Sequence, residues 1–336
     1  MPVRNEAGAI GPALQAVLDQ RLDHGEVEVI VIDGSSTDTT VAEAEHTADA
    51  AGRQVTIFDN PAGIVPISMN IGLRHATGAV IVRVDGHCEI PPGYVQHCLD
   101  LLDAHPEADC VGGALETVGE GAVARGIAEA QSSIAGVGNA TFRTGATEGR
   151  FVDTLAFGAY RREVFDRIGG FDEELVRNQD DELNLRLTQD GRKIWLDPTV
   201  VVRYHSRASL RGLRRQYFQY GLYKVRVLQK RGTLASARQL VPTAFVLALG
   251  GSAALGLARR ELRWPALVLV PYAVVVAAAT ADVARRDPPA APSAAAAVPI
   301  MHLAYGTGFL AGFWRWRQGF RRSSSASTPE VPTDVR

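Results

Sequence analysis

The sequence predicts an α/β domain with a mainly parallel central sheet, followed by a basic segment and about three membrane helices. Three observations support this prediction: β-branched runs alternate with helical patterns, an acid-free basic stretch follows, and three nearly uncharged apolar segments come last. We expect four regions: the α/β domain at 1–205, a basic amphipathic interfacial collar at 206–239, membrane helices at 240–322 and a disordered tail at 323–336.

Strands and helices alternate through the first region. Four apolar residues that share one helical face predict the first helix: Ile10, Leu14, Val17 and Leu18. The continuous run VEVIVID at 27–33 predicts a parallel strand that is covered on both faces. Strand-like runs recur at 54–58, 79–85, 109–118 and 152–160, with helical patterns at 66–76, 93–104 and 161–168. Ligands of such sheets bind beyond the carboxyl ends of the strands, where Asp33 and Asp85 are expected.

The first residues, MPVRNEAGAI, indicate a loop that leads into the first helix with no strand before it. If the sheet needs a first strand, its residues would lie upstream of Met1. This is a hypothesis, and a soluble, active enzyme made from this chain would count against it.

Charge is unevenly distributed along the chain. Residues 1–205 contain 16 Lys and Arg against 32 Asp and Glu, whereas residues 206–239 contain 9 basic residues and no acids. This collar also has aromatic residues at Tyr217, Phe218, Tyr220 and Tyr223. Cationic and aromatic residues together suit an interfacial helix at an anionic membrane surface. A solvated helix face is the alternative, and nucleic acid is not an expected partner because hydrophobic segments follow directly.

The three apolar segments at 240–258, 264–284 and 294–314 each approach the roughly 20 residues needed to cross a bilayer. Three buried core helices of this composition would not fit one small domain, so membrane segments are favoured. Flanking arginines do not settle the orientation. Three full crossings would place four arginines opposite the acidic domain, so a re-entrant segment stays an alternative. We expect the acidic domain on the cytoplasmic side of the inner membrane, because the first residues show no signal region.

The cysteine content indicates reduced thiols. Cys88, Cys98 and Cys110 are odd in number and form no CxxC pair, so buried free thiols fit better than disulfides or a zinc site.

Two polar motifs follow predicted strands. Asp33 begins DGSSTDTT, which taken alone is better explained as a turn with a helix N-cap. Asp85 ends the strand VIVRVD, and His87 lies two residues later, so both side chains point the same way in an extended tip. A divalent cation that links such a tip to a diphosphate would neutralise leaving-group charge. A third stretch, NPAGIVPISMNIGLRHATG, places Asn70 near a helix start and is uninformative alone.

Three consecutive acids, Asp180, Asp181 and Glu182, begin a predicted helix. The helix dipole stabilises acids there, so a structural role is possible. Successive helical residues point about 100° apart, which lets one acid face a cleft as a base while Glu182 pairs with Arg186 on another side.

Taken together and in this order, these stretches resemble the inverting family 2 glycosyltransferases of the GT-A fold. They are most similar to the membrane-associated subgroup typified by succinoglycan-biosynthesis glycosyltransferases, over roughly residues 1–230. The resemblance implies a nucleotide pocket bordered by Pro2, Arg4 and Glu6, with Asp33 contacting the uracil or ribose. Many members have a second acid after this Asp, whereas this chain has Gly34, which puts that second contact in doubt.

The resemblance also assigns roles to the later motifs. Asp85 and His87 take the first and last positions of the DxD motif, and His205 lies where the family presents a histidine near the metal or diphosphate. Asn70 is grouped with the donor-binding residues. Asp180 takes the position of the catalytic base, with Asp181 as second choice. The implied cofactor is Mn²⁺ or Mg²⁺, and the softer imidazole ligand favours Mn²⁺. Alternatively, His87 only donates a hydrogen bond to the diphosphate or a nearby loop.

The expected activity is inverting transfer of a glucose-like sugar from a UDP-sugar to a polyprenyl-linked saccharide, in exopolysaccharide or cell-surface glycan synthesis. Processive synthases carry QxxRW, whereas this chain has QYFQY from Gln216, which favours addition of a single sugar. Two alternatives stay open: transfer to polyprenyl phosphate itself, and a catalytically silent sugar-nucleotide-binding membrane protein.

Overall fold

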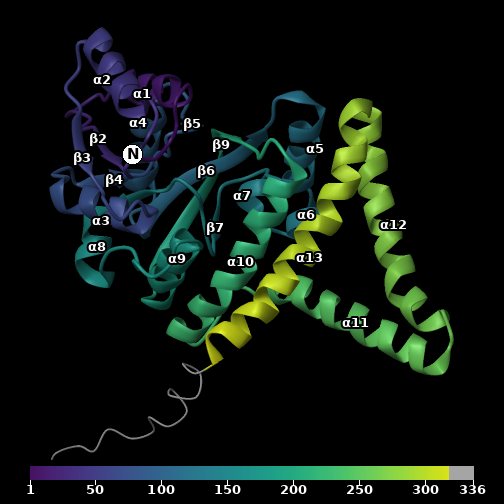
Figure 1. Ribbon diagram of the computed structural model, residues 1–336. Coiled ribbons are helices and arrows are strands. Elements are labelled where there is room, and N and C mark those ends of the chain that lie inside the picture. The colour runs from purple at the N-terminus through teal and green to yellow at the C-terminus, as the bar shows by residue number, and fades with distance from the viewer. Residues whose placement is uncertain (318–336) are drawn as a thin grey trace, which may run out of the picture.

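The computed structural model describes residues 1–317 (Figure 1). It contains an α/β body and three long C-terminal helices, which the long helix α10 (Leu210–Arg231) links to the body. The tail predicted at 323–336 lies outside the described residues.

The body contains two sheets. Strands β1 (Pro2–Val3), β2 (Ile30–Asp33) and β3 (Thr56–Asp59) form a parallel sheet in that order. The second sheet has the order β4 (Val80–Val82), β8 (Ala159–Arg161), β6 (Ala108–Val118), β9 (Lys193–His205) and β5 (Cys88–Glu89), and β7 (Arg150–Val152) also pairs with β9. The long strands β6 and β9 run parallel, and the other pairs in this sheet are antiparallel.

A short first strand lies inside the segment that the sequence indicated as a loop. Pro2 and Val3 pair with Ile32 and Asp33 of β2, and the Met1 carbonyl accepts a hydrogen bond from the Ile32 amide at 2.9 Å. The expectation of no strand before the first helix is therefore wrong for Pro2 and Val3. A cavity of about 560 Å³ is lined by residues of β2 and of the segment that contains β4.

The body contains the predicted helices and further helices between residues 121 and 144 that were not predicted from the sequence. They are α1 (Ile10–Leu18), α2 (Thr40–Ala51), α3 (Val65–His75), α4 (Tyr94–Ala104), α5 (Gly121–Ser132), α6 (Ile134–Val137), α7 (Thr141–Thr144), α8 (Arg162–Ile168) and α9 (Gln179–Gln189). All four apolar residues that predicted α1 are buried. The strand predicted at 152–160 is not continuous: β7 ends at Val152 and β8 begins at Ala159, and between them Phe157 adopts a φ of 57°, which extended strands do not use.

The three cysteines are confirmed as buried free thiols in the core of the body. Burial raises the pKa of the Cys98 thiol to about 12, which keeps it protonated and unreactive.

Three C-terminal helices are long and apolar enough to cross a membrane. They are α11 (Val241–Arg259), α12 (Arg263–Arg286) and α13 (Ala291–Arg315), with the short helices η1 (Ala237–Leu240) and η2 (Pro288–Ala290) before α11 and α13. Their apolar windows differ in burial: 11% for the first, 6% for the second and 44% for the third. Figure 1 shows α13 lying along α10 while α11 and α12 extend away from the body.

Glycines allow α10 and α13 to pack closely. A Cβ added at Gly308 would lie 2.1 Å from the Phe218 carbonyl oxygen, and one added at Gly221 would lie 2.0 Å from the Tyr305 oxygen. Small residues at such contacts are typical of helices that associate in membranes, where close backbone packing replaces the hydrophobic driving force.

Both ends of α13 contact parts of the body or α10. At its start, the Ser293 hydroxyl donates to the Ala122 carbonyl of α5 at 3.0 Å, and Arg286 at the end of α12 pairs with Glu129 at 3.0 Å. At its other end, the Trp316 carbonyl accepts a hydrogen bond from Gln229 of α10 at 2.9 Å. Helix α13 therefore follows the surface of the body and α10 along its whole length.

Candidate active site

Arg83 joins two carboxylates that are far apart in the sequence. Its Nε and Nη2 atoms donate to the two oxygens of Asp85 at 2.8 and 3.1 Å, and its Nη1 donates to Asp180. Arg83 follows β4 and is 7% exposed, while Asp180 lies in the first turn of α9. The structure thus brings together the predicted donor-binding acid and the predicted base. Sequence reasoning missed Arg83, although a basic residue inside the otherwise apolar strand before Asp85 was a signal.

The same guanidinium affects its two partners differently. Burial acts to raise the pKa of Asp85, but the charge of Arg83 and its two hydrogen bonds hold that pKa below the ordinary value. For Asp180, burial outweighs the attraction of Arg83, and its pKa is raised. A carboxylate with a raised pKa is a stronger base for a proton than an ordinary aspartate.

His87 lies beside the predicted pocket residue Glu6. Its Nδ1 is 3.0 Å from Glu6 Oε1, and its ring centroid is 5.8 Å from that of Tyr204 on β9. Burial alone would lower the pKa of His87, but the hydrogen bond with Glu6 and the charge of Asp85 raise it. The structure therefore groups Glu6, Asp85 and His87 at the carboxyl ends of β1 and β4.

His205 is placed differently. It ends β9, and its Nε2 lies 3.5 Å from Glu89 Oε1 of β5. Within residues 1–317, His205 forms no hydrogen bond or ion pair with Asp85 or His87, so its role near a metal or diphosphate stays a prediction.

A divalent cation would find two protein ligands here. Asp85 and His87 supply a carboxylate and an imidazole, a donor set that suits Mn²⁺ or Mg²⁺. Within residues 1–317, no three His, Cys, Asp or Glu side chains converge on one point, and both Asp85 oxygens accept hydrogen bonds from Arg83. A cation held by these two residues would therefore have to take its other ligands from a bound diphosphate, as Mg²⁺ commonly does.

The remaining predicted donor-binding residues hold the loops of the first sheet. The Asp33 carboxylate accepts from the Ser36 hydroxyl at 2.5 Å and its amide at 3.0 Å, so the turn interpretation describes its contacts in this structure. Arg4 Nη1 donates to the Gly63 carbonyl at 2.7 Å. Pro2 is buried in β1 beside them.

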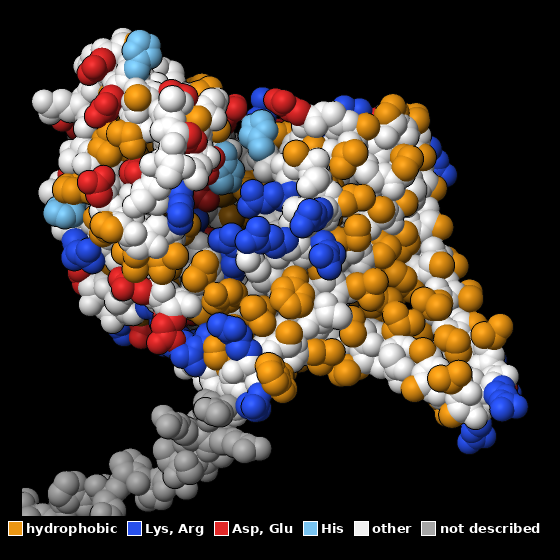
Figure 2. Space-filling model, viewed as in Figure 1, with side chains coloured by type: hydrophobic (Ala, Val, Ile, Leu, Met, Phe, Trp, Pro, Cys, Tyr) orange, Lys and Arg blue, Asp and Glu red, His pale blue; other side chains and the backbone are white. Residues whose placement is uncertain are grey.

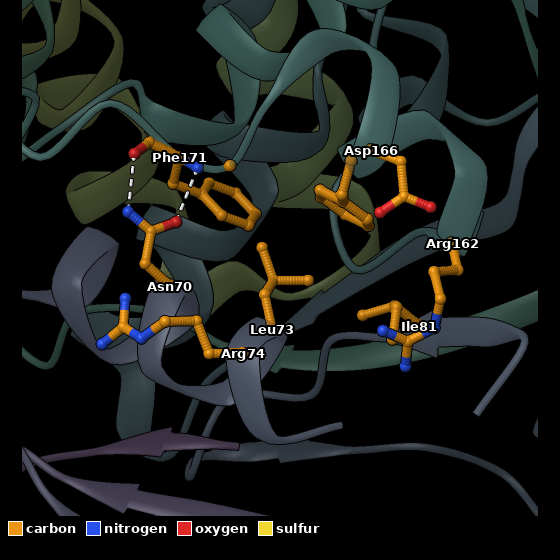
Figure 3. A pocket seen from close by; sticks show the side chains of 9 residues that line it. Asn70, Leu73, Arg74, Ile81, Arg162, Asp166 and Phe171 are labelled. Carbon is orange, nitrogen blue, oxygen red and sulfur yellow. Dashed lines mark hydrogen bonds between the residues drawn. The ribbon is translucent and has the colours of Figure 1, made fainter. Parts of the chain in front are cut away.

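Asn70 holds α3 against the loop that precedes α9 (Figure 3). Its Oδ1 accepts from the Phe171 amide at 2.8 Å, and its Nδ2 donates to the Phe171 carbonyl at 2.9 Å. These residues line a pocket of about 330 Å³ with Leu73 and Arg162, whose lining does not include Asp85 or Asp180. Because both polar atoms of Asn70 are engaged, its contacts are those of a structural residue.

The other two acids of α9 face α10. Asp181 pairs with Lys224 Nζ at 2.5 Å and accepts from Gln239 Nε2 at 2.9 Å. Glu182 pairs with Arg186 at 2.7 Å, as the helical spacing predicted, and also with Arg231. Asp181 is thus committed to an ion pair away from Arg83, which leaves Asp180 as the better candidate base.

The basic collar consists of two different halves. In its second half the cations neutralise acids of α9 and the preceding loop: Lys224 pairs with Asp181, Arg226 with Glu174, Lys230 with Asp172 and Arg231 with Glu182. The charges of this half are therefore neutralised inside the protein, and the interfacial position expected for the collar at 206–239 stays a prediction. We call the first half, Arg207 to Arg215, the arginine patch.

Comparison with known proteins identifies the family. The sequence pattern of Glycosyl transferase family 2 matches residues 1–169. The succinoglycan biosynthesis protein ExoA of Rhizobium meliloti (strain 1021) is 33% identical over 330 residues, which cover 96% of this chain and 95% of that protein. A Methanococcus voltae enzyme, dolichyl N-acetyl-alpha-D-glucosaminyl phosphate 3-beta-D-2,3-diacetamido-2,3-dideoxy-beta-D-glucuronosyltransferase, is 25% identical over 240 residues, 68% of this chain and 73% of that one.

A solved structure supports the fold. Mannosyltransferase PcManGT from Pyrobaculum calidifontis, in complex with GDP-Man and Mn²⁺, has a TM-score of 0.56 at 20% identity, covering 94% of this chain and 86% of that one. The family pattern and the fold together define a glycosyltransferase of the GT-A class with three candidate membrane helices, which confirms the predicted fold class. The chain belongs to glycosyl transferase family 2, of the ExoA type.

Proposed function

We propose that this glycosyltransferase moves a glucose-like sugar, with inversion, from a UDP-sugar to a polyprenyl-linked saccharide in exopolysaccharide or cell-surface glycan synthesis. The observation that carries the proposal is the buried contact of Asp180 and Asp85 through Arg83. The ExoA relative is a succinoglycan biosynthesis protein, and the name of the Methanococcus relative contains a dolichyl-linked sugar. The first relative supports a role in exopolysaccharide synthesis, and the second supports a lipid-linked acceptor.

In this mechanism, Asp180 takes the proton from the attacking hydroxyl of the acceptor, which approaches the anomeric carbon opposite the leaving nucleoside diphosphate. Arg83 holds the Asp180 carboxylate in place from the side of Asp85. In-line attack from this side inverts the anomeric configuration. Asp33, Arg4 and Glu6 lie at the ends of β1 and β2, where we place the nucleotide.

We infer that a divalent cation enters with the donor and is held by Asp85 and His87. When bound, it neutralises charge on the leaving diphosphate.

Chelation with EDTA is expected to abolish transfer, and added Mn²⁺ is expected to restore it better than Mg²⁺. Full activity after exhaustive chelation, with metal content checked by mass spectrometry, would contradict this inference.

The donor and product are tested together. Membranes containing the full chain are incubated with a panel of labelled UDP-sugars, and the lipid extract is analysed. We expect label in a lipid that carries a saccharide of at least two sugars on a diphosphate. A single sugar on a single phosphate would instead support the rival function, transfer to polyprenyl phosphate. No turnover of any donor would support the silent binding protein.

We also propose that the protein sits in the inner membrane with its catalytic body in the cytoplasm. The apolar and largely exposed helices α11 and α12 support membrane insertion. Their contacts with the body at η1 and η2 support two crossings by one hairpin, since Arg238 pairs with Asp153 at one end and Arg286 with Glu129 at the other.

A further inference from the structure

The arginine patch has no acidic partners within the described part of the chain. Arg207, Arg211, Arg214 and Arg215 are all exposed, and none forms an ion pair with Asp or Glu in residues 1–317. The last three lie at helical spacings of three and four, so they share one face of α10. This arrangement contrasts with the second half of α10, where every cation is paired.

Arg143 of α7 adds a fifth cation that is held without being neutralised. Its guanidinium lies 5.4 Å from the Phe142 ring centroid and 5.7 Å from that of Tyr204. Its Nη1 is buried and has no hydrogen-bond partner. Aromatic rings hold a cation in place but do not satisfy its N–H donors. Arg143 therefore presents an unused donor for an anion.

These cations lie next to the candidate active site. Tyr204, which contacts Arg143, also contacts His87, and Arg207 is close enough to act electrostatically on His87. Figure 2 shows Lys and Arg side chains gathered over α7 and the first part of α10, between the acidic body and the hydrophobic surface of the C-terminal helices. Across this face the candidate catalytic site comes first, the cations lie next to it, and the apolar helices follow.

We infer that Arg143 and the arginine patch bind the phosphate groups of the polyprenyl-linked acceptor. This inference rests on the proposed function. A lipid-linked saccharide has its phosphates between the sugar and the apolar chain, which matches the order of the three surfaces. Guanidinium groups bind phosphate oxygens through paired, charge-assisted hydrogen bonds. The patch thereby places the acceptor sugar at Asp180 while its chain lies against the exposed apolar helices.

The test uses farnesyl diphosphate as the probe, with the full chain in nanodiscs of neutral phosphatidylcholine. Binding to wild type is compared with the triple variant R211Q/R214Q/R215Q and with a matched control, R259Q/R260Q/R263Q, at the turn between α11 and α12. We expect the first variant to bind farnesyl diphosphate at least about tenfold more weakly than wild type. The control is expected to bind it as tightly as wild type does. The variant R211K/R214K/R215K keeps the charge but lacks the paired guanidinium donors, so it is expected to bind more weakly than wild type and more tightly than the glutamine variant.

Equal affinity of wild type and the glutamine variant would overturn the inference. The inference would also be overturned if the glutamine variant kept its affinity for farnesyl diphosphate and lost only its binding to phosphatidylglycerol vesicles. That result would mean that the arginines contact bulk lipid. Failure of the proposed function is distinguishable: wild type would turn over no UDP-sugar, while the binding comparison would still give its own result.

Discussion

At the scale of residues, Arg83 contacts both carboxylates of the candidate site. Burial raises the pKa of Asp180 above the ordinary value, and the charge of Arg83 offsets only part of this effect. A general base must be deprotonated, so activity falls as the pH drops through the pKa of Asp180. Because this pKa is raised, we expect kcat/KM to fall on the acid side at a pH above about 3.9, the ordinary pKa of aspartate. We call this fall the acid limb.

Replacing Arg83 by Gln is expected to move that acid limb to higher pH. The substitution removes a positive charge that favours the carboxylate, and protonation becomes easier. The variant R83K, which keeps the charge, serves as the control and should keep the limb near its wild-type position. The pH profile of kcat/KM is the measurement, and a limb that stays fixed or moves downward in R83Q would contradict the role given to Arg83.

Local patterns in the sequence predicted most of these residues but not the contacts between them. Asp85 and His87 could be predicted because a strand ends directly before them, and Asp180 because three acids begin a helix. The contact of Arg83 with Asp180 joins residues 97 positions apart, and no local periodicity encodes such a contact. The ion pair of Asp181 with Lys224 also joins residues that are distant in the sequence. The sequence alone therefore left Asp181 as a second candidate base.

At the scale of elements, the packing of α10 against α13 depends on small residues. Gly308→Leu would force a side chain into the Phe218 carbonyl, where a Cβ alone lies 2.1 Å away. We expect a loss of about 1–3 kcal/mol in the free energy of unfolding, as for other overpacked sites. Gly250→Leu on α11 is the matched control, because no atom lies within 4 Å of its added Cβ.

Thermal unfolding of both variants in detergent measures this difference. A lowered Tm in G308L with an unchanged Tm in G250L is the expected result. Equal values for the two variants would mean that the close contact of α10 and α13 does not stabilise the folded protein.

Element prediction succeeded where periodicity was strong. Helix α1 was predicted from one apolar helical face, and strand β2 was predicted from a continuous apolar run that suits burial on both faces. The collar at 206–239 had a uniform composition, yet its halves differ, because the acids that neutralise the second half come from α9 and the loop before it. Composition describes a segment and does not show which partner the fold places against it.

At the scale of the whole molecule, the course of α13 bears on the membrane topology. Helix α13 contacts α5 at its start and α10 at its end, so it follows the body instead of leaving it. In the topology proposed above, two crossings by α11 and α12 would return the chain to the side of the catalytic body. This arrangement removes the difficulty of four translocated arginines after a third crossing.

Cysteine labelling tests this topology, since all three native cysteines are buried. Leu262→Cys lies at the turn between α11 and α12, and Arg285→Cys lies at the end of α12. With a membrane-impermeant thiol reagent on spheroplasts, we expect Leu262→Cys to react directly and Arg285→Cys to react only after permeabilisation. Equal reactivity at both positions before permeabilisation would contradict the two-crossing hairpin.

The most direct test of the central claim is the initial rate of sugar transfer from labelled UDP-sugars into membrane lipid by wild type and Asp180→Asn. We expect the variant to lose about 10²–10⁴-fold in rate, because it lacks a general base, while it still binds UDP. Asp181→Asn, which alters the pair with Lys224, is the neighbouring control and should keep far more activity. Equal transfer by wild type and Asp180→Asn would contradict the assignment of Asp180 as the base.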